Sequence, residues 1–364
     1  MSEHAKTPGG LDFTYQAQPM RVVFRAGAVP DAVPAETERL GLRRILVLCD
    51  ERGMDPARAV AASLGDACAG LHPGAVMHVP VEAADEAEKA ARRTRADGCA
   101  AVGGGSVIGL AKAVALRTGL PIVAVPTTYA GSEMTPIWGL TGGGVKRTGR
   151  DPKVLPRSVV YDPELTRSMP AGLSAASGMN AMAHAVEALY APDATPVISL
   201  MAEEGVRALA GALPDVVDDP SGLDARSRAL YGAWLCGACL GATTMSLHHK
   251  LCHVLGGTFD LPHAETHAVV LPHVLAFNAP AVPEALAALG RALGVTDPAR
   301  ELYELGGRLG VPRSLAELGM SIADIDRAVK VAVTAPYANP REASADDLRA
   351  ILQMAYTGGA PRGR

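Results

Sequence analysis

Long apolar runs and clustered basic residues are both missing from this sequence. No apolar stretch approaches membrane-spanning length, and the first residues, MSEHAKTPGGLDFTYQAQPM, contain neither a basic start followed by an apolar run nor a small-residue cleavage site. The 34 Lys and Arg are outnumbered by 38 Asp and Glu, whereas a surface that binds nucleic acid normally carries a basic excess. We therefore expect a cytoplasmic protein that binds neither a membrane nor nucleic acid.

Cysteine pairs and aromatic side chains are also scarce. The six cysteines are scattered through apolar segments, as is typical of reduced thiols in the cytosol. The single C-x-x-C pair, Cys236 and Cys239, has no second pair with which to complete a metal site. A redox or metal role stays open for it, but small buried side chains on one face of a helix are the favoured interpretation. Aromatic residues make up 4% of a chain that is 48% hydrophobic, which predicts a core of small aliphatic side chains.

The length and the hydrophobic pattern predict two domains. At 364 residues the chain exceeds the size at which one hydrophobic core usually stops growing. In residues 1–162, short aliphatic runs alternate with longer amphipathic ones, which predicts an α/β domain with a parallel, doubly wound sheet. Its expected strands are 22–24, 44–48, 75–79, 99–102 and 122–125, and its expected helices include 56–64 and 82–95.

Residues 163–364 have a different pattern, because strand-like runs give way to long stretches with helical periodicity. We expect an all-helical second domain. Its expected helices are 175–190, 197–209, 225–241, 246–256, 263–278, 283–293, 300–309 and 346–356.

A glycine run in AAVGGGSVIGLAKAVAL is the sharpest motif of the first half. A predicted strand leads into Gly103, Gly104, Gly105 and Ser106 and then directly into a helix. Residues without side chains let a pyrophosphate approach the backbone, and the free N–H groups of a helix start attract its charge. The alternative is an ordinary tight turn, and the spacing matches neither the dinucleotide fingerprint nor the Walker pattern. Three successive glycines exceed what a turn needs, so phosphate binding is favoured.

Polar residues follow two other predicted strands. Thr127 and Thr128 end the strand in LPIVAVPTTYAGSEMTP, and Asp50 ends the strand in RRILVLCDERG. Ligands bind at the carboxyl ends of strands in open parallel sheets, where an acidic side chain can accept hydrogen bonds from the adenosine ribose. The alternatives are capping threonines and a solvated loop acid.

Histidines gather in the second half. Six of the ten lie between His184 and His267, and His248, His249, His253 and His263 share the segment LHHKLCHVLGGTFDLPHAETH. His249 and His253 are one helical turn apart, as are Asn180 and His184 in GMNAMAHAVEALY. Buried imidazoles need polar partners, so this number within apolar helices predicts a shared functional cavity rather than isolated core histidines.

Five segments carry most of these residues: GGGSVIGLAK, PTTYAGSEMTP, DPKVLPRSVVYDP, GMNAMAHAVEALY and HHKLCHVLGGTFDLPHAETHAVVLPH. In this order and spacing, from about Phe13 to the C-terminal helices, they resemble the iron-containing alcohol dehydrogenase superfamily. Within it the chain is most similar to the maleylacetate reductases, which share PTTYAGSEMTP, WLCG and the GMNA segment. The resemblance implies a Rossmann-like N-terminal domain, an all-α C-terminal domain, an active site in the cleft between them, and a homodimer.

The resemblance also bears on metal binding. Metal-dependent members hold their ion with one Asp and three His, and the corresponding positions here are Asn180, His184, His249 and His263. Replacement of the carboxylate by an amide removes the only anionic ligand, so divalent ions should bind much less well. The same exchange is usual in maleylacetate reductases, and Gly109, where many relatives carry Asp, fits that branch too. We expect no metal.

The implied reaction is NAD(P)H-dependent reduction of the conjugated C=C bond of maleylacetate to 3-oxoadipate, late in aromatic-ring degradation. His253 and His263 are expected to donate to the enolate oxygen and to carbon, and the spacing does not assign either role to either residue. His249 and His184 are expected to shape the pocket. Lys250 is the candidate partner for the carboxylates of this dicarboxylate substrate, and a solvated surface lysine is the alternative.

The cofactor is expected to be NADH, with NADPH possible, because the carboxylate of Asp50 favours a ribose hydroxyl over a phosphate. The residues that match cofactor contacts of the superfamily are Gly104, Gly105, Ser106, Thr127, Thr128 and Lys146. Two rival functions remain. One is a metal-dependent alcohol dehydrogenase, against which Asn180 counts. The other is a non-redox descendant of the fold, against which the retained GGGS run, Thr127, Thr128 and Asp50 count.

Overall fold

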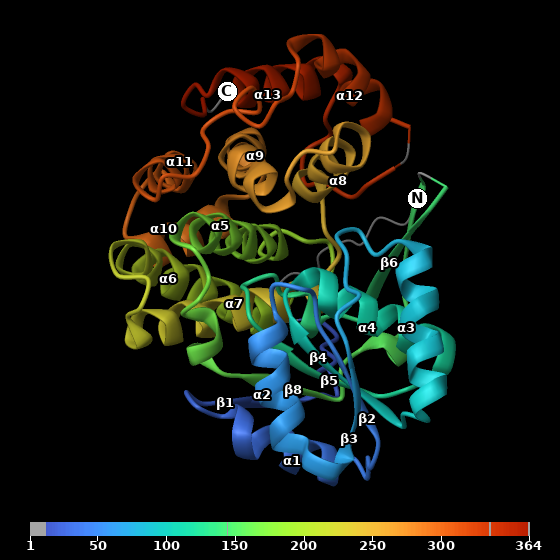
Figure 1. Cartoon of the computed structure of the whole chain (residues 1–364). Coiled ribbons are helices and arrows are strands. Elements are labelled where there is room, and N and C mark those ends of the chain that lie inside the picture. The colour runs from blue at the N-terminus through green and yellow to red at the C-terminus, as the bar shows by residue number, and fades with distance from the viewer. Residues whose placement is uncertain (1–11, 144, 335, 363–364) are drawn as a thin grey trace.

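The computed structural model describes residues 12–362 except 144 and 335, and it consists of a sheet-containing half and a helical half (Figure 1). Strands and helices alternate up to Tyr161, and among the residues described beyond it every regular element is a helix. The expected fold class is therefore confirmed. The boundary between residues 162 and 163 stays a prediction, because one hydrophobic cluster continues from the sheet into the helical half.

Six parallel strands form the main sheet, in the order β1-β8-β5-β4-β2-β3. They are β1 (Arg21–Phe24), β2 (Ile45–Leu48), β3 (Cys68–His72), β4 (Gly98–Gly103), β5 (Ile122–Pro126) and β8 (Ser158–Tyr161). The four inner strands are buried over their whole length, as expected for a parallel sheet that helices cover on both faces.

Four helices cover the two faces of the sheet. They are α1 (Val29–Arg39), α2 (Met54–Leu64), α3 (Val81–Thr94) and α4 (Gly105–Thr118). Alternate residues of β2 divide between the faces: Ile45 and Val47 pack with α1 and α2, whereas Leu46 and Leu48 pack with α3 and α4. The aliphatic run of each inner strand therefore supplies two hydrophobic layers at once.

Two parts of the sheet-containing half differ from expectation. The strand expected at 75–79 is wrong: His78 and Val79 have φ values of 63° and 47°, which no extended strand has, and the strand lies earlier, in β3. The half-buried, mixed sequence of β3 gave no aliphatic signal. An antiparallel hairpin of β6 (Ile137–Gly142) and β7 (Val145–Arg150), which was not expected, follows β5.

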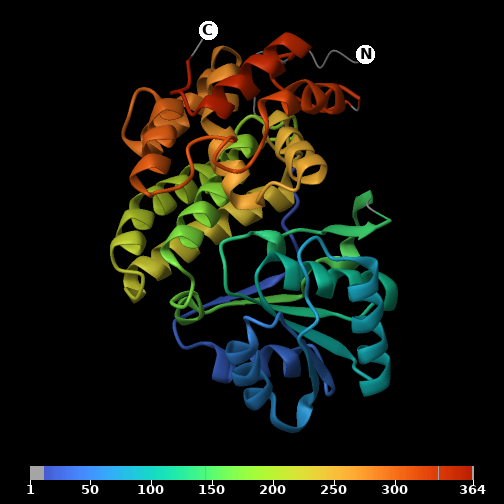
Figure 2. The same ribbon diagram turned by 45° about the horizontal axis from the view of Figure 1, so that its top comes forward.

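The helical half contains nine α-helices within the described residues. They are α5 (Ala171–Ala188), α6 (Pro196–Asp218), α7 (Leu223–Ala242), α8 (Leu247–Phe259), α9 (His263–Asn278), α10 (Pro283–Leu293), α11 (Pro298–Arg308), α12 (Ile325–Ala332) and α13 (Ala345–Thr357). Eight of them match expected helices, two with identical bounds, and α12 was not expected. Both views place α12 and α13, in red, far from the sheet (Figures 1 and 2).

The helices of the described residues do not individually have the length and apolar character to cross a membrane. Only α7 and α8 together reach that length, and the two helices meet at 96°.

The loop that follows β5 joins the two halves. The Tyr129 amide donates to Ser177 Oγ on α5 at 3.2 Å. A Cβ built on Gly131 would lie 3.0 Å from the α-carbon of Gly237 on α7, so the two backbones touch, and only glycine fits at a φ of 75° there. The carboxyl end of β5 is therefore held directly against α5 and α7, which carry or flank the histidine segments.

Candidate active site

The glycine run lies at the carboxyl edge of the sheet. β4 ends at Gly103, and α4 begins at Gly105 with no side chain capping its first turn. A Cβ built on Gly104 would lie 3.0 Å from both Cγ2 and Oγ1 of Thr128, so the loops after β4 and β5 are in close contact. The start of α4 therefore offers uncapped N–H groups beside the Thr128 hydroxyl, which is an arrangement suited to an anionic phosphate.

The other candidate cofactor residues lie at the same edge. The Thr127 amide donates to the Gly103 carbonyl at 3.2 Å, which ties the two loops together. Asp50 follows β2, the neighbour of β4, and its Oδ1 accepts the Gly53 amide at 2.6 Å. Lys146 belongs to β7, but its side chain lies outside the described part of the structure.

Lys112, a residue that the sequence analysis did not single out, fixes the loop after β5. Its ammonium group is buried, and its shortest hydrogen bonds go to that loop and to the first residue of β6. The acceptors are Ser132 O (2.6 Å), Thr135 Oγ1 (2.8 Å) and Ile137 O (2.8 Å). Burial lowers the pKa of Lys112 to about 7. A buried lysine in an otherwise apolar helix, IGLAKAVAL, was the available signal.

Six imidazoles from three helices come together in the helical half. His184 belongs to α5, His248, His249 and His253 to α8, and His263 and His267 to α9. His249 is central: its ring centroid lies 5.2 Å from that of His184, 6.1 Å from that of His253 and 4.9 Å from that of His267. The ring of His263 lies 4.5 Å from that of His267. The predicted clustering of histidines is therefore what the fold produces.

Three buried imidazoles of this cluster are uncharged near neutral pH. Burial lowers the pKa of His184, His248 and His267 well below the ordinary value, and the neighbouring imidazoles lower it further. His248 Nε2 and His267 Nδ1 lie 2.9 Å apart and share a hydrogen bond. His253 and His263, in contrast, are exposed. The cluster thus has a dry inner part and an accessible outer part.

Several polar atoms of the inner part have no hydrogen-bond partner. They are Asn180 Oδ1, His184 Nδ1, His249 Nε2 and His267 Nε2. Buried polar atoms are normally satisfied, so this set predicts that a ligand or water completes it. The Asn180, His184 and His249 atoms belong to the positions that correspond to metal ligands in the superfamily, and none of these three residues supplies a carboxylate.

A buried carboxylate is hydrogen-bonded to the histidine cluster. Glu187 lies three residues after His184 on α5 and its side chain is 0% exposed. Its Oε2 lies 2.7 Å from His249 Nδ1 and accepts the Ser246 amide at 2.9 Å, while its Oε1 accepts the His248 amide at 2.7 Å. The sequence analysis missed Glu187, although a lone acid in the apolar run AMAHAVEALY could have pointed to it.

Lys250 is half-buried next to His249 in α8. Within the described ranges no ion pair of Lys250 is found. Successive residues of a helix point in different directions, and proximity in the chain does not by itself aim Lys250 at the imidazoles.

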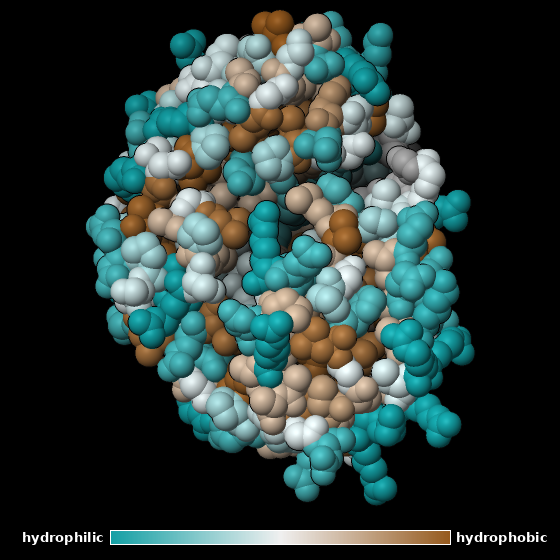
Figure 3. Space-filling model, in the orientation of Figure 1, coloured by the Kyte–Doolittle hydropathy of each residue, from teal (hydrophilic) through white to brown (hydrophobic). Residues whose placement is uncertain are grey.

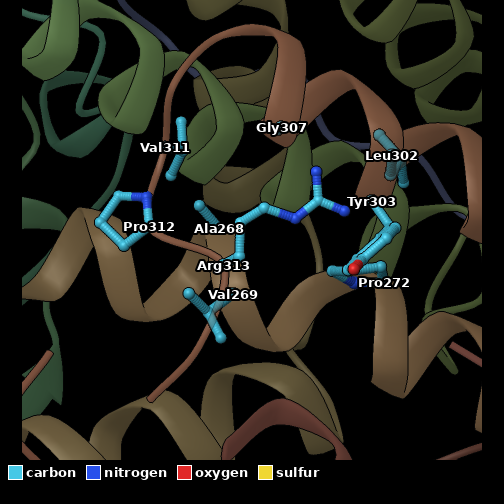
Figure 4. A pocket seen from close by; sticks show the side chains of 10 residues that line it. Ala268, Val269, Pro272, Leu302, Tyr303, Gly307, Val311, Pro312 and Arg313 are labelled. Atoms are coloured by element: carbon cyan, nitrogen blue, oxygen red, sulfur yellow. The ribbon is translucent and has the colours of Figure 1, made fainter. Parts of the chain in front are cut away.

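The molecular surface is hollowed where the two halves meet (Figure 3). A different hollow, on the α11 side of α9, is lined by Pro272, Tyr303 and Arg313 (Figure 4). Its free volume of about 10 Å³ holds about one water molecule, which excludes it as a substrate site.

The two cysteines of the C-x-x-C pair have a packing role, the interpretation that the sequence favoured. Cys236 and Cys239 are buried free thiols on α7, and burial raises the pKa of Cys239 to about 12. Cys236 Sγ packs against Gly205 of α6, where an added Cβ would lie 2.9 Å away. Thiols so buried and so weakly acidic are packing residues.

Comparison with known proteins agrees with the geometry. Residues 19–163 match the iron-containing alcohol dehydrogenase family, and residues 174–356 match the C-terminal part of the Fe-containing alcohol dehydrogenase family. The chain belongs to the iron-containing alcohol dehydrogenase family. Both halves of this family member are covered, from the first strand of the sheet to α13.

Its similar relatives within the family include several maleylacetate reductases. The maleylacetate reductase of Sphingobium indicum is 54% identical over 351 residues, which cover 96% of this chain and 99% of that protein. The crystal structure of maleylacetate reductase from Agrobacterium tumefaciens superposes with a TM-score of 0.93 at 49% identity and covers 97% of this chain and 100% of that one. The crystal structure of maleylacetate reductase from Rhizobium sp. strain MTP-10005 has a TM-score of 0.92 at 50% identity, covering 96% and 99%.

Proposed function

We propose that this family member reduces the conjugated C=C bond of maleylacetate to give 3-oxoadipate, with NADH as the reductant and without a bound metal. The observation that carries the proposal is the buried cluster of neutral imidazoles with Asn180 at the position where metal-dependent relatives have a carboxylate. About 50% identity to maleylacetate reductases over nearly the whole chain supports it.

The chemistry explains why imidazoles suffice. Maleylacetate carries an alkene conjugated to a ketone, so addition of hydride at the far alkene carbon moves negative charge onto the ketone oxygen and forms an enolate. A hydrogen-bond donor stabilises this oxygen, and a proton then returns to the carbon beside the carbonyl. His253 and His263, at the accessible part of the cluster, are the proposed donors, and His184 and His249 shape the inner wall.

The carboxyl edge of the sheet offers the groups that would hold the cofactor. The uncapped start of α4 at Gly104, Gly105 and Ser106 would hold the pyrophosphate, and the Thr128 hydroxyl lies against Gly104. Thr127, Lys146 and Asp50 are the further proposed contacts. NADH, when bound, supplies the hydride. Asp50 Oδ1 is occupied by the Gly53 amide, which leaves Oδ2 for a ribose hydroxyl and makes NADH the preferred form, with NADPH possible.

A divalent metal fits the residues present less well. The donor set of Asn180, His184, His249 and His263 contains no anion, and the nearby carboxylate of Glu187 is already occupied by the start of α8. Neutral donors alone leave the charge of a divalent ion uncompensated, so we propose that no metal takes part.

The remaining assignments follow from the proposed reaction. Lys250 is the proposed partner of a substrate carboxylate, and the protein is proposed to act as a cytoplasmic homodimer in the degradation of aromatic compounds.

A metal-dependent alcohol dehydrogenase is the second candidate, and the buried, unpartnered Asn180, His184 and His249 atoms favour it. Rates with maleylacetate and with simple aldehydes, each measured from the absorbance of NADH after dialysis against a chelator, separate the two. The proposal requires maleylacetate turnover without metal. Aldehyde turnover that depends on added iron or zinc, with none on maleylacetate, would establish the alternative. Absence of both, together with no saturable NADH binding, would indicate a non-redox descendant of the fold.

A further inference from the structure

Glu187 occupies an unusual position between two helices. It projects from α5 and meets only hydrogen-bond donors at the start of α8. Oε1 accepts the His248 amide at 2.7 Å, and Oε2 accepts the amides of Ser246 at 2.9 Å and His249 at 3.4 Å. In the described residues no lysine or arginine pairs with it. Both carboxylate oxygens therefore act as acceptors.

This geometry determines how the carboxylate meets the imidazole of His249. Oε2 already accepts backbone N–H groups, which can only donate, and it lies 2.7 Å from His249 Nδ1. Nδ1 must therefore carry the proton of this hydrogen bond. An imidazole that carries only this proton leaves Nε2 with a lone pair.

The other nitrogen of His249 is buried within the histidine cluster. His249 Nε2 is buried without a partner, and the rings of His184, His253 and His267 surround that of His249 at 5.2, 6.1 and 4.9 Å between centroids. His249 thus presents an unpartnered acceptor within the histidine cluster.

We propose that Glu187 is a positioning residue that holds His249 in its Nδ1–H tautomer, so that His249 accepts a hydrogen bond in the site and does not protonate the enolate. The functional consequence rests on the proposed function, whereas the tautomer itself does not. Proton donation to the enolate then belongs to His253 and His263, and His249 orients a donor, either a neighbouring imidazole N–H or an N–H or O–H group of the bound ligands.

A purely structural role for Glu187 makes a different prediction. The α8 N-cap, Ser246, makes no side-chain capping bond, so the Glu187 carboxylate is also the cap of this helix. If capping were its whole role, removal of the charge would lower stability but leave the His249 tautomer and its part in turnover unchanged. The test must therefore read the tautomer directly.

The tautomer can be read in the full-length protein labelled with 15N-histidine. Long-range 1H–15N correlation spectra distinguish a protonated ring nitrogen from one with a lone pair, and the His249 signals are assigned as those lost in His249→Gln. We expect wild type to have protonated Nδ1 and unprotonated Nε2. In Glu187→Gln, whose amide NH₂ can donate to Nδ1, we expect a shift toward the Nε2–H form. The matched control is Ser246→Ala, whose Oγ has no hydrogen-bond partner and whose loss should leave the tautomer unchanged.

Kinetics tests the second half of the proposal. Glu187→Gln should lower kcat for maleylacetate about tenfold or more with the KM for NADH nearly unchanged, and Glu187→Gln with His249→Gln should be no slower than His249→Gln alone. Losses that multiply in the double variant would show that Glu187 does not act through His249. A protonated Nε2 in wild type, in the other tautomer or in the imidazolium, would overturn the proposal whether or not the variants fold. No turnover on maleylacetate, with the expected tautomer present, would refute the proposed function and leave the Glu187 assignment standing.

Discussion

Asn180→Asp tests the metal-free site most directly. Asn180 is 3% exposed on α5, and its Oδ1 has no partner. The substitution places a charge one helical turn from His184 on α5, whose imidazole is neutral because burial lowers its pKa. An uncompensated buried charge costs about 3 kcal/mol. For a domain of this size that lowers Tm by roughly 6 to 12 °C.

The same carboxylate completes the set of one Asp and three His that metal-dependent relatives use. Zinc or iron at about 1,000 times its Kd stabilises a folded protein by about 4.1 kcal/mol. Added metal should therefore recover the whole loss of Tm in Asn180→Asp. In wild type, which offers only neutral ligands, added metal should raise Tm by no more than about 1 or 2 °C, corresponding to less than about 1 kcal/mol. Asn180→Leu is the control, since it has similar volume but neither charge nor donor and should not respond to metal.

Thermal unfolding with a chelator and with increasing metal gives these values, and elemental analysis and maleylacetate reduction accompany them. We expect well under one equivalent of iron or zinc in purified wild type and no improvement of this reaction in Asn180→Asp. Stoichiometric metal in wild type, with activity lost on chelation and regained on adding the ion back, would refute the argument from neutral donors.

Three further predictions use the same preparations. Asp50→Ala should lower the ratio of kcat/KM with NADH to kcat/KM with NADPH about tenfold, which corresponds to roughly 1.4 kcal/mol. A wild type whose kcat/KM is higher with NADPH would contradict the assignment of Asp50. His253→Ala and His263→Ala should each lower kcat by about two orders of magnitude while calorimetry finds NADH binding intact, and a near-normal kcat removes that residue from the mechanism. Because burial lowers the pKa of Lys112 to about 7 from its ordinary 10.5, the unfolded chain binds more protons between these values, so wild-type stability should rise from about pH 7 toward pH 10. Lys112→Met should be less stable and should lack this rise; equal slopes in denaturant unfolding would show that another group is responsible.

The local sequence pattern was sufficient to predict the bounds of an element where that element buries one continuous apolar face. The bounds of α9 and α10 equal those expected, although Pro272 lies inside α9. The local sequence pattern predicted a strand wrongly at 75–79, where AVMHV has the pattern of a strand. There Thr141 of the hairpin donates its hydroxyl to His78 O at 2.8 Å and its amide to Val79 O at 3.0 Å, which holds both residues at positive φ. A contact made by a distant segment thus overrode the local preference.

The residue types alone determined the chemistry of this protein: glycines that allow close approach of phosphate, an amide in place of a carboxylate at Asn180, and a surplus of imidazoles. Only the tertiary structure decided which imidazoles are dry and neutral, which are exposed, and that Glu187 meets His249 although 62 residues separate them. The reason is physical, because protonation and tautomer depend on desolvation and on hydrogen-bond partners within about 3 Å, and helix packing sets both.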